Sequence, residues 1–290
     1  MNDYIVSVLL GIVEGLTEFL PVSSTAHLRI SEALLHISLL DPYWKMYTIV
    51  IQLGAILALL LVFTGRIVEF LRTFPEGGEH KRTIWNHPLT LTLIAFVVTA
   101  VPSLLLSKTI GKHLESIHIM ALSLLVGGVV MWVVDIWSNR TEQRTKHVEQ
   151  MSLGQAIWIG LCQVTSAVFP GTSRSMSTIT GGQIAGMSRP SALEFSFLVS
   201  IPVMVAATGY DLLKTLHPKH AEGADAIAPL VMTGHGWIVL AIGFIVSFFV
   251  ALGVVEWFLQ WVRKHGFVPF AVYRILLGVV LLVWGARILA

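Results

Sequence analysis

The sequence predicts an all-α, polytopic integral membrane protein with about six transmembrane helices and two re-entrant helix-loop-helix elements in an inverted repeat. Three observations lead to this prediction. Of the 290 residues, 55% are hydrophobic and 12% are charged, whereas a soluble domain carries about 25% charged residues. Six apolar stretches approach the length of about 20 residues that crosses a bilayer as a helix. Two further apolar stretches are interrupted by proline, serine and threonine.

Composition excludes several classes of protein. The low charged fraction excludes a water-soluble enzyme and a disordered protein, and a formal net charge of +2 indicates no nucleic-acid partner. The single cysteine, Cys162, cannot form an internal disulfide. The first residues carry no basic n-region or cleavage site, so we expect the first apolar stretch to be retained. We expect one membrane domain over residues 1–290, with repeat halves at about 1–136 and 150–290.

The six expected spans show features typical of membrane helices. Trp44, Trp137, Trp237 and Trp261 lie at or near span ends, where the amphipathic indole ring is enriched. The spans, in chain order, are residues 44–63, 89–106, 117–137, 193–213, 237–260 and 270–289.

Lysine and arginine are distributed unequally between the two ends of these spans. We expect the richer end to be cytoplasmic, which places both termini and the histidine-bearing loop 217–235 on the outer side. The richer end carries Arg66, Arg72, Lys81, Arg82, Arg140, Arg144, Lys146, Arg189, Arg263 and Lys264. The other carries Lys45, Lys108, Lys112, Lys214, Lys219 and Arg287, with Arg29 nearby.

The two interrupted stretches, residues 5–40 and 153–187, resemble each other. Interrupted backbone at membrane depth is tolerated only inside protein or beside a wet cavity, so each stretch predicts a helix-loop-helix that enters and leaves on one side. They align at a constant offset of 149 residues, pairing Gly11 with Gly160, Glu14 with Gln163, Pro21 with Pro170 and Ser24 with Ser173. Three spans separate them. This odd number predicts an inverted repeat with a binding site where the breaks meet.

Glu14 and Glu18 lie in the first interrupted stretch. Their spacing of four places both carboxylates on one face of a helix. An ionisable group inside a membrane costs about 2.5–3.5 kcal/mol and indicates a function with a partner nearby. The pair therefore requires a divalent cation, an arginine or a shared proton.

Hydroxyls and an imidazole follow at the first break. Ser23, Ser24 and Thr25 come directly after Pro21 and Val22, where side chains and freed amides can bind a ligand. His27 lies within reach of Ser24, and a serine beside an imidazole is a minimal activated nucleophile. Serines at a helix start also serve as caps, and this alternative stays open.

The second break predicts a phosphate site. Gly171 permits close approach of backbone, and the hydroxyls of Thr172, Ser173, Ser175 and Thr178 surround the start of a helix, where anions bind. Arg174 supplies the planar fork that matches phosphate oxygens. The alternative is a structural ion pair of Arg174 with Glu14 or Glu18, and the two interpretations are compatible.

The remaining buried charges have plainer interpretations. Glu194 and Glu256 lie at span ends or inside the protein, and Arg274 is a candidate partner of either. The sequence contains no Walker motif, Rossmann glycine pattern or Cys/His zinc spacing.

The two motifs together resemble the undecaprenyl-diphosphate phosphatase family (UppP/BacA), also called the bacitracin resistance family. They are EGLTEFLPVSSTAH at residues 14–27 and PGTSRS at residues 170–175, and the resemblance covers nearly the whole chain. It implies hydrolysis of undecaprenyl diphosphate to the monophosphate lipid carrier of cell-wall synthesis, and bacitracin resistance. It also implies a location in the bacterial inner membrane, with the site opening to the outer, periplasmic face.

By motif position, the resemblance implies roles for particular residues. Glu14 and Glu18 match the family's acidic pair, which we expect to hold Mg²⁺ or Ca²⁺. Ser24 and His27 match its serine and histidine, and Ser173, Arg174 and Thr178 match its phosphate-binding segment. The sequence departs from the family at Met176, where glycine is usual. The larger side chain either narrows the entry to the second hairpin or marks a subgroup of the family.

Several alternatives stay open. Ser24 attacks the terminal phosphate, or His27 activates a water instead. A secondary transporter shares the pattern of inverted repeat and midplane carboxylates, and a lipid scramblase would bind the carrier without cleaving it. The expected partners are the polyprenyl diphosphate and membrane lipid, with no nucleic acid. A homodimer is one candidate assembly.

Overall fold

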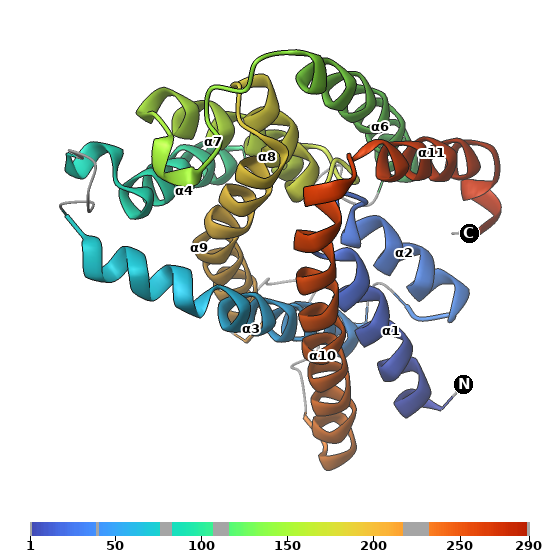
Figure 1. Cartoon of the computed structure of the whole chain (residues 1–290). Helices are drawn as coiled ribbons and strands as arrows, with labels where there is room; N and C mark the ends of the chain where they lie inside the picture. The colour runs from blue at the N-terminus through green and yellow to red at the C-terminus, as the bar shows by residue number, and fades with distance from the viewer. Residues whose placement is uncertain (1, 39–40, 76–82, 107–115, 217–231, 289–290) are drawn as a thin grey trace.

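The computed structural model describes residues 2–38, 41–75, 83–106, 116–216 and 232–288 (Figure 1). Within these ranges every regular element is a helix, and the only β pairing is an isolated bridge between Thr145 and Met187. The elements are α1 Asp3–Thr17, α2 Ser24–Leu34, α3 Pro42–Thr73, η1 Ile84–Asn86, α4 Pro88–Leu105, α6 Ile117–Arg140, η2 Val148–Gln150, α7 Leu153–Val168, α8 Arg174–Ile184, α9 Arg189–Leu216, α10 Gly234–Lys264 and α11 Val268–Ile288.

The six expected spans are confirmed as helices. α3, α4, α6, α9, α10 and α11 are each long and apolar enough to cross a membrane. Pro42 and Pro88 occupy the first turns of α3 and α4, where the missing N–H costs nothing. α3 and α10 run past their apolar segments to Arg72 and Lys264, because cations in a last turn interact favourably with the helix dipole.

Each interrupted stretch forms two helices around a break, as predicted. α2 packs back against α1, and α8 against α7. The two ends of the second hairpin lie side by side, since the side chain of Gln155 at the start of α7 donates a 2.9 Å hydrogen bond to the carbonyl of Ala185 after α8. Val6 of α1 and Leu35 after α2 join a single hydrophobic cluster, so the first hairpin also closes on itself. Entry of the hairpins into a membrane stays a prediction.

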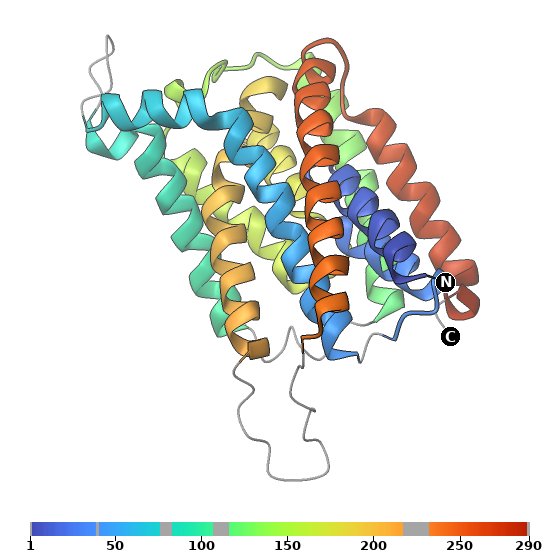
Figure 2. The ribbon, with the colours of Figure 1, turned by 90° about the horizontal axis from the view of Figure 1, so that it is seen from below.

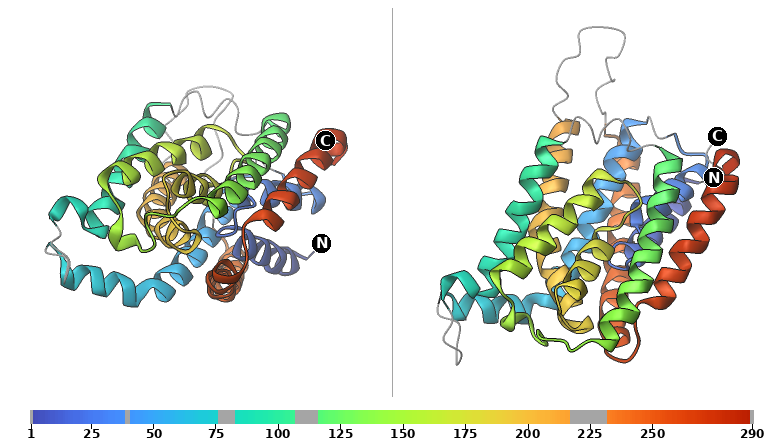
Figure 3. Two further views of the ribbon diagram at one scale, coloured as in Figure 1. Left: turned by 45° about the horizontal axis from the view of Figure 1, so that its top comes forward. Right: turned by 90° about the horizontal axis from the view of Figure 1, so that it is seen from above.

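The two hairpins open at opposite ends of α3. Near its start, Tyr47 donates 2.9 Å to the carbonyl of Ser7 in α1. Near its end, Arg66 pairs with Glu149, which lies just before α7. Figures 2 and 3 show the start of α1 at the end of the bundle where α3 and α10 begin, and the α6–α7 connection at the other. This arrangement confirms the predicted inverted order.

Packing repeats between the two halves as well. α1 packs on α10, and its counterpart α7 packs on α4. A Cβ added to Gly11 would lie 2.8 Å from the carbonyl oxygen of Gly243, and one added to Gly160 would lie 2.7 Å from that of Ala95. The aligned glycines therefore perform the same function, which is to let one helix backbone contact the next.

The alignment after the breaks is wrong by one residue. Ser23 and Ser173 are the equivalent residues, because each caps the following helix with a positive φ, 76° and 71°. The pairing of Ser24 with Ser173 fails since the second break has one more residue between its proline and its cap. Ser24 is therefore the counterpart of Arg174, the first residue of α8.

The structure describes some of the lysines and arginines on which the predicted orientation rests. The end of α6, the start of α9 and the end of α10 lie at the end of the bundle opposite the start of α1 (Figures 2 and 3). These helix ends carry Arg140, Arg189 and Arg263. The assignment of that end to the cytoplasm stays a prediction. Residues outside the described ranges include Lys81, Arg82, Lys108, Lys112, Lys219 and the histidines of 217–231.

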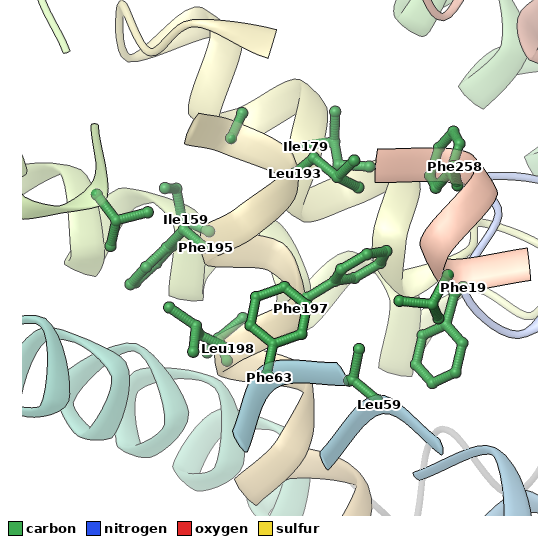
Figure 4. Packing of buried hydrophobic residues seen from close by; sticks show 14 of the residues in the cluster. Phe19, Leu59, Phe63, Ile159, Ile179, Leu193, Phe195, Phe197, Leu198 and Phe258 are labelled. Carbon is green, nitrogen blue, oxygen red and sulfur yellow. The ribbon is translucent and has the colours of Figure 1, made fainter. Parts of the chain in front are cut away.

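Aromatic packing ties the first break to the core (Figure 4). Phe19 lies in the break and packs edge-on against Phe197 of α9, with ring centroids 5.6 Å apart. Phe63 of α3 contacts the same ring at 5.8 Å, and Phe258 of α10 contacts it at 6.3 Å. Helices α3, α9 and α10 thus hold the residue next to Glu18 in place.

Asp135 connects four elements at the opposite end of the bundle. Its fully buried carboxylate accepts hydrogen bonds from Arg189 at 2.7 and 3.0 Å, from Gln183 at 3.0 Å and from the backbone N–H of Phe267 at 2.9 Å. These bonds join α6, α8, α9 and the start of α11.

We expect Asp135→Ala to lower the free energy of unfolding by about 3–5 kcal/mol, because Arg189 loses its buried partner. Thermal unfolding in detergent micelles measures this. Glu69→Ala is the matched control, since Glu69 is 55% exposed in its pair with Arg66 and such pairs contribute about 0–1 kcal/mol. Equal shifts for the two variants would contradict the prediction.

Candidate active site

The two breaks meet each other inside the protein. The hydroxyl of Ser175 donates 2.9 Å to the carbonyl of Leu20. The guanidinium of Arg274, on α11, donates to the carbonyls of Pro21 at 3.2 Å, Gly171 at 3.1 Å and Thr172 at 2.8 Å. These contacts confirm that the interrupted elements of the repeat come together.

An acid from the first hairpin and a guanidinium from the second form the centre of the cluster. Arg174 donates 3.3 Å to Oε1 of Glu18, and their side chains are 14% and 6% exposed. Ser24 donates to the other carboxylate oxygen, Oε2. Because Ser24 and Arg174 are each the first residue of the second helix in a hairpin, the repeat itself delivers both donors to one carboxylate.

Glu14 adds a second carboxylate one turn earlier. It is buried, and both carboxylates interact electrostatically with Arg174. Oε1 of Glu14 and Nη1 of Arg174 are buried and have no hydrogen-bond partner among the described residues. A buried polar group without a partner costs about 1–3 kcal/mol. An unpaired acceptor and an unpaired donor in one cluster are what a bound ligand would satisfy.

The cluster has the chemistry to accept a divalent cation. When both acids are ionised, two carboxylates against one guanidinium leave one negative charge uncompensated, and carboxylate oxygens suit Mg²⁺ and Ca²⁺. Within the described part of the chain, no group of three or more His, Cys, Asp and Glu residues is placed to hold a metal. Glu14 and Glu18 would therefore hold an ion only together with substrate or water oxygens, which is how Mg²⁺ commonly binds.

Both helices that start at the cluster begin in a strained conformation. Ser23 and Ser173 adopt positive φ, which costs a non-glycine residue about 1–3 kcal/mol. Their hydroxyls accept from the backbone N–H of Ala26 at 3.4 Å and Met176 at 3.3 Å. The positive ends of two helix dipoles therefore lie beside Glu18 and Arg174, which favours an anionic ligand.

His27 does not contact Ser24 in the structure. Its Nδ1 lies 2.7 Å from the carbonyl of Ser23, and its Nε2 lies 2.6 Å from the hydroxyl of Tyr273 on α11. The hydroxyl of Ser24 is instead directed at Glu18. The expected serine–imidazole pair is therefore replaced by a serine–carboxylate pair.

The other predicted binding residues are distributed around the breaks. Thr25 is exposed on α2, away from the buried cluster. Thr178 is buried one turn into α8 and shares a 2.6 Å hydrogen bond with Ser196. Gly171 has a φ of 89°, and a Cβ there would lie 2.6 Å from the carbonyl of Met120, so this turn requires glycine. Of the hydroxyls, Ser24 alone contacts an acid of the cluster.

Sequence reasoning missed Gln52 and Thr208 and gave Arg274 the wrong partners. Gln52 of α3 donates 3.5 Å to Glu18 and accepts 3.2 Å from Thr208 of α9. The pairing of Arg274 with Glu194 or Glu256 is wrong, since Arg274 binds backbone carbonyls and Glu194 pairs with Arg66 at 2.8 Å. The signal was present, because glutamine and arginine inside expected spans are costly without partners.

Met176 packs between α8 and α6. It is 5% exposed in the main hydrophobic cluster, and its terminal methyl would lie 2.7 Å from a Cβ added to Gly127 of α6. Narrowing of the entry to the second hairpin by this side chain stays a prediction.

Comparison with known proteins gives one consistent result. The family model described as "Bacitracin resistance protein BacA" matches residues 7–280. A protein of Koribacter versatilis named "Undecaprenyl-diphosphatase" is 62% identical over 99% of this chain and 100% of its own length. Relatives of the same name from Caldanaerobacter subterraneus subsp. tengcongensis and Thermus thermophilus are 41% and 40% identical, over 97% and 94% of this chain and 96% and 94% of their own lengths.

Proposed function

Because this chain belongs to the bacitracin resistance protein BacA family, we infer that it is an undecaprenyl-diphosphatase. It hydrolyses undecaprenyl diphosphate to undecaprenyl phosphate and phosphate. This reaction recycles the lipid carrier of cell-wall synthesis and removes the diphosphate that bacitracin binds. The six apolar helices agree with a multi-pass membrane protein acting on a lipid.

The observation that carries a site assignment is the Glu18–Arg174 contact between the breaks. Arg174 has one terminal nitrogen on Glu18 and the other, Nη1, without a partner. We propose that Nη1 binds an oxygen of the terminal phosphate. Phosphoryl transfer requires mostly positioning and charge stabilisation, and a guanidinium between two helix N-termini supplies both.

Two routes for the nucleophile stay open. In the serine route, the geometry favours Glu18 rather than the expected His27 as the base. In the first, Ser24 Oγ attacks the terminal phosphorus, the bond from phosphorus to the bridging oxygen breaks, and undecaprenyl phosphate leaves. The Ser24 proton passes to Glu18, the carboxylate that it contacts. A water then attacks the phosphoserine, the bond from phosphorus to Ser24 Oγ breaks, and phosphate is released as Oγ regains a proton. In the second route, a water attacks the terminal phosphorus directly and gives its proton to His27 or Glu18, the same bridging bond breaks, and undecaprenyl phosphate and phosphate leave. A divalent cation on Glu14 and Glu18 would offset phosphate charge in either route.

Phosphate release from purified protein tests the function. We expect release from undecaprenyl diphosphate and from farnesyl diphosphate, and we expect a chelator to reduce it if Glu14 and Glu18 hold a cation. A trapped phosphoserine that disappears in Ser24→Ala supports the first route, whereas near-normal turnover by Ser24→Ala excludes it. Proton-coupled flux or lipid scrambling in liposomes without phosphate release would favour a carrier instead.

We propose that the site opens to the outer face of the bacterial inner membrane. The distribution of lysine and arginine supports this orientation. In a Cys162→Ser background, a membrane-impermeant thiol reagent should label Asn2→Cys and not Thr141→Cys in intact spheroplasts. The reverse pattern would contradict the orientation. Cross-linking in the same membranes tests whether the protein forms a homodimer.

A further inference from the structure

The two hydrogen bonds of His27 define the tautomer of its neutral ring. The carbonyl of Ser23, 2.7 Å from Nδ1, can only accept a hydrogen bond. Nδ1 therefore carries the proton, and Nε2 of the neutral ring carries the lone pair. The hydroxyl of Tyr273, 2.6 Å away, donates to that lone pair. The nitrogen that can act as a base is thus the one that Tyr273 holds.

Tyr273 also fixes the plane of the imidazole. The two rings are stacked, with centroids 5.6 Å apart and an interplanar angle of 12°. The near-parallel ring and the hydrogen bond of the same residue together restrain rotation of the His27 side chain. A cap at Ser23 alone would restrain only the Nδ1 edge.

The neighbouring residue gives Tyr273 a fixed position. Arg274 is fully buried and binds carbonyls of both breaks and of Ser123 in α6. α11 therefore cannot shift relative to the breaks without losing these bonds. Arg274 is also the charged group on α11 whose field reaches His27.

We propose that Tyr273 is a positioning residue of the active site, which orients neutral His27 in the Nδ1–H tautomer so that Nε2 can accept a proton once the attacking water takes the place of the Tyr273 hydroxyl as its hydrogen-bond donor. The proposal rests on the proposed phosphatase function. It assigns to α11 a role in proton transfer, in addition to the acid pair of α1 and the arginine of α8.

Tyr273→Phe tests the proposal, because it keeps the stacked ring and removes only the hydroxyl. We expect kcat to fall about tenfold, the effect of one hydrogen bond, with KM nearly unchanged and an altered pH profile of kcat/KM. Tyr210→Phe on α9, where the ring is exposed, should change neither. Wild-type kcat and pH profile in Tyr273→Phe would overturn the proposal.

A second measurement does not depend on activity. In protein labelled with ¹⁵N-histidine, the His27 signals, assigned with His27→Gln, report which ring nitrogen carries the proton. We expect the Nδ1–H form in both proteins, because the Ser23 carbonyl holds that proton, and a shifted Nε2 signal in Tyr273→Phe, where the hydrogen bond from the Tyr273 hydroxyl is lost. An unchanged Nε2 signal in the variant would contradict the contact. An Nε2–H form in the wild type would overturn the positioning role even if phosphate release is normal. Expected tautomers without phosphate release would instead contradict the function.

Discussion

We expect the Arg174→Ala variant to release phosphate at least about 100-fold more slowly than the wild type. The substitution removes the donor for the substrate phosphate and leaves Glu18 buried without its ion-pair partner. Breaking a buried pair in this way costs about 3–5 kcal/mol, and each 1.36 kcal/mol of barrier is tenfold in rate. Steady-state phosphate release by the purified variant measures the loss.

The lysine variant separates charge from geometry. Arg174→Lys keeps the charge but replaces a planar fork with a single point of charge, so it should recover only part of the rate. The double variant Arg174→Ala with Glu18→Gln shows whether the two residues act as a unit, in which case their effects are far from additive. Wild-type turnover by Arg174→Ala would remove this residue from the site.

We expect Arg274→Met to reduce kcat/KM by about 100-fold although Arg274 pairs with no acid in the part of the chain that the structure describes. Its guanidinium joins Pro21 in the first break to Gly171 and Thr172 in the second. Methionine fills much of the same volume but donates nothing, so the breaks lose their common partner. A displacement of about 1 Å in a catalytic group can cost 10²-fold in rate.

The control must separate misplacement from general destabilisation. Asp135→Ala destabilises the other end of the bundle, and below its unfolding midpoint it should retain most of its activity. Arg274→Lys should not rescue, because an ammonium on a flexible stem cannot reproduce the fork that reaches carbonyls of both breaks. An Arg274→Met variant with wild-type kcat/KM would show that the breaks hold their positions without it.

Sequence patterns alone determined the helical class and most element positions. A run of about 20 apolar residues in a membrane forms a helix, because no water is present there to bond the backbone N–H and C=O groups and a helix bonds them internally. The breaks at Pro21 and Pro170 were also readable, since proline and hydroxyl residues interrupt an apolar run visibly. The acid pair and Arg174 were identifiable for a similar reason: charges at membrane depth are costly and require partners.

Only the tertiary structure decided which partner each of these groups has. A one-residue difference between the breaks, invisible in an ungapped alignment, makes Ser23 rather than Ser24 the counterpart of Ser173, and so makes Ser24 the counterpart of Arg174. His27 was expected beside Ser24 from their spacing, yet a helix start at Ser24 carries the two side chains in different directions, to Tyr273 and to Glu18. Tyr273 and Arg274 are some 250 residues from the first break along the chain, and no local pattern specifies such contacts. Local chemistry fixes where a charge is tolerated, whereas long-range packing fixes what neutralises it.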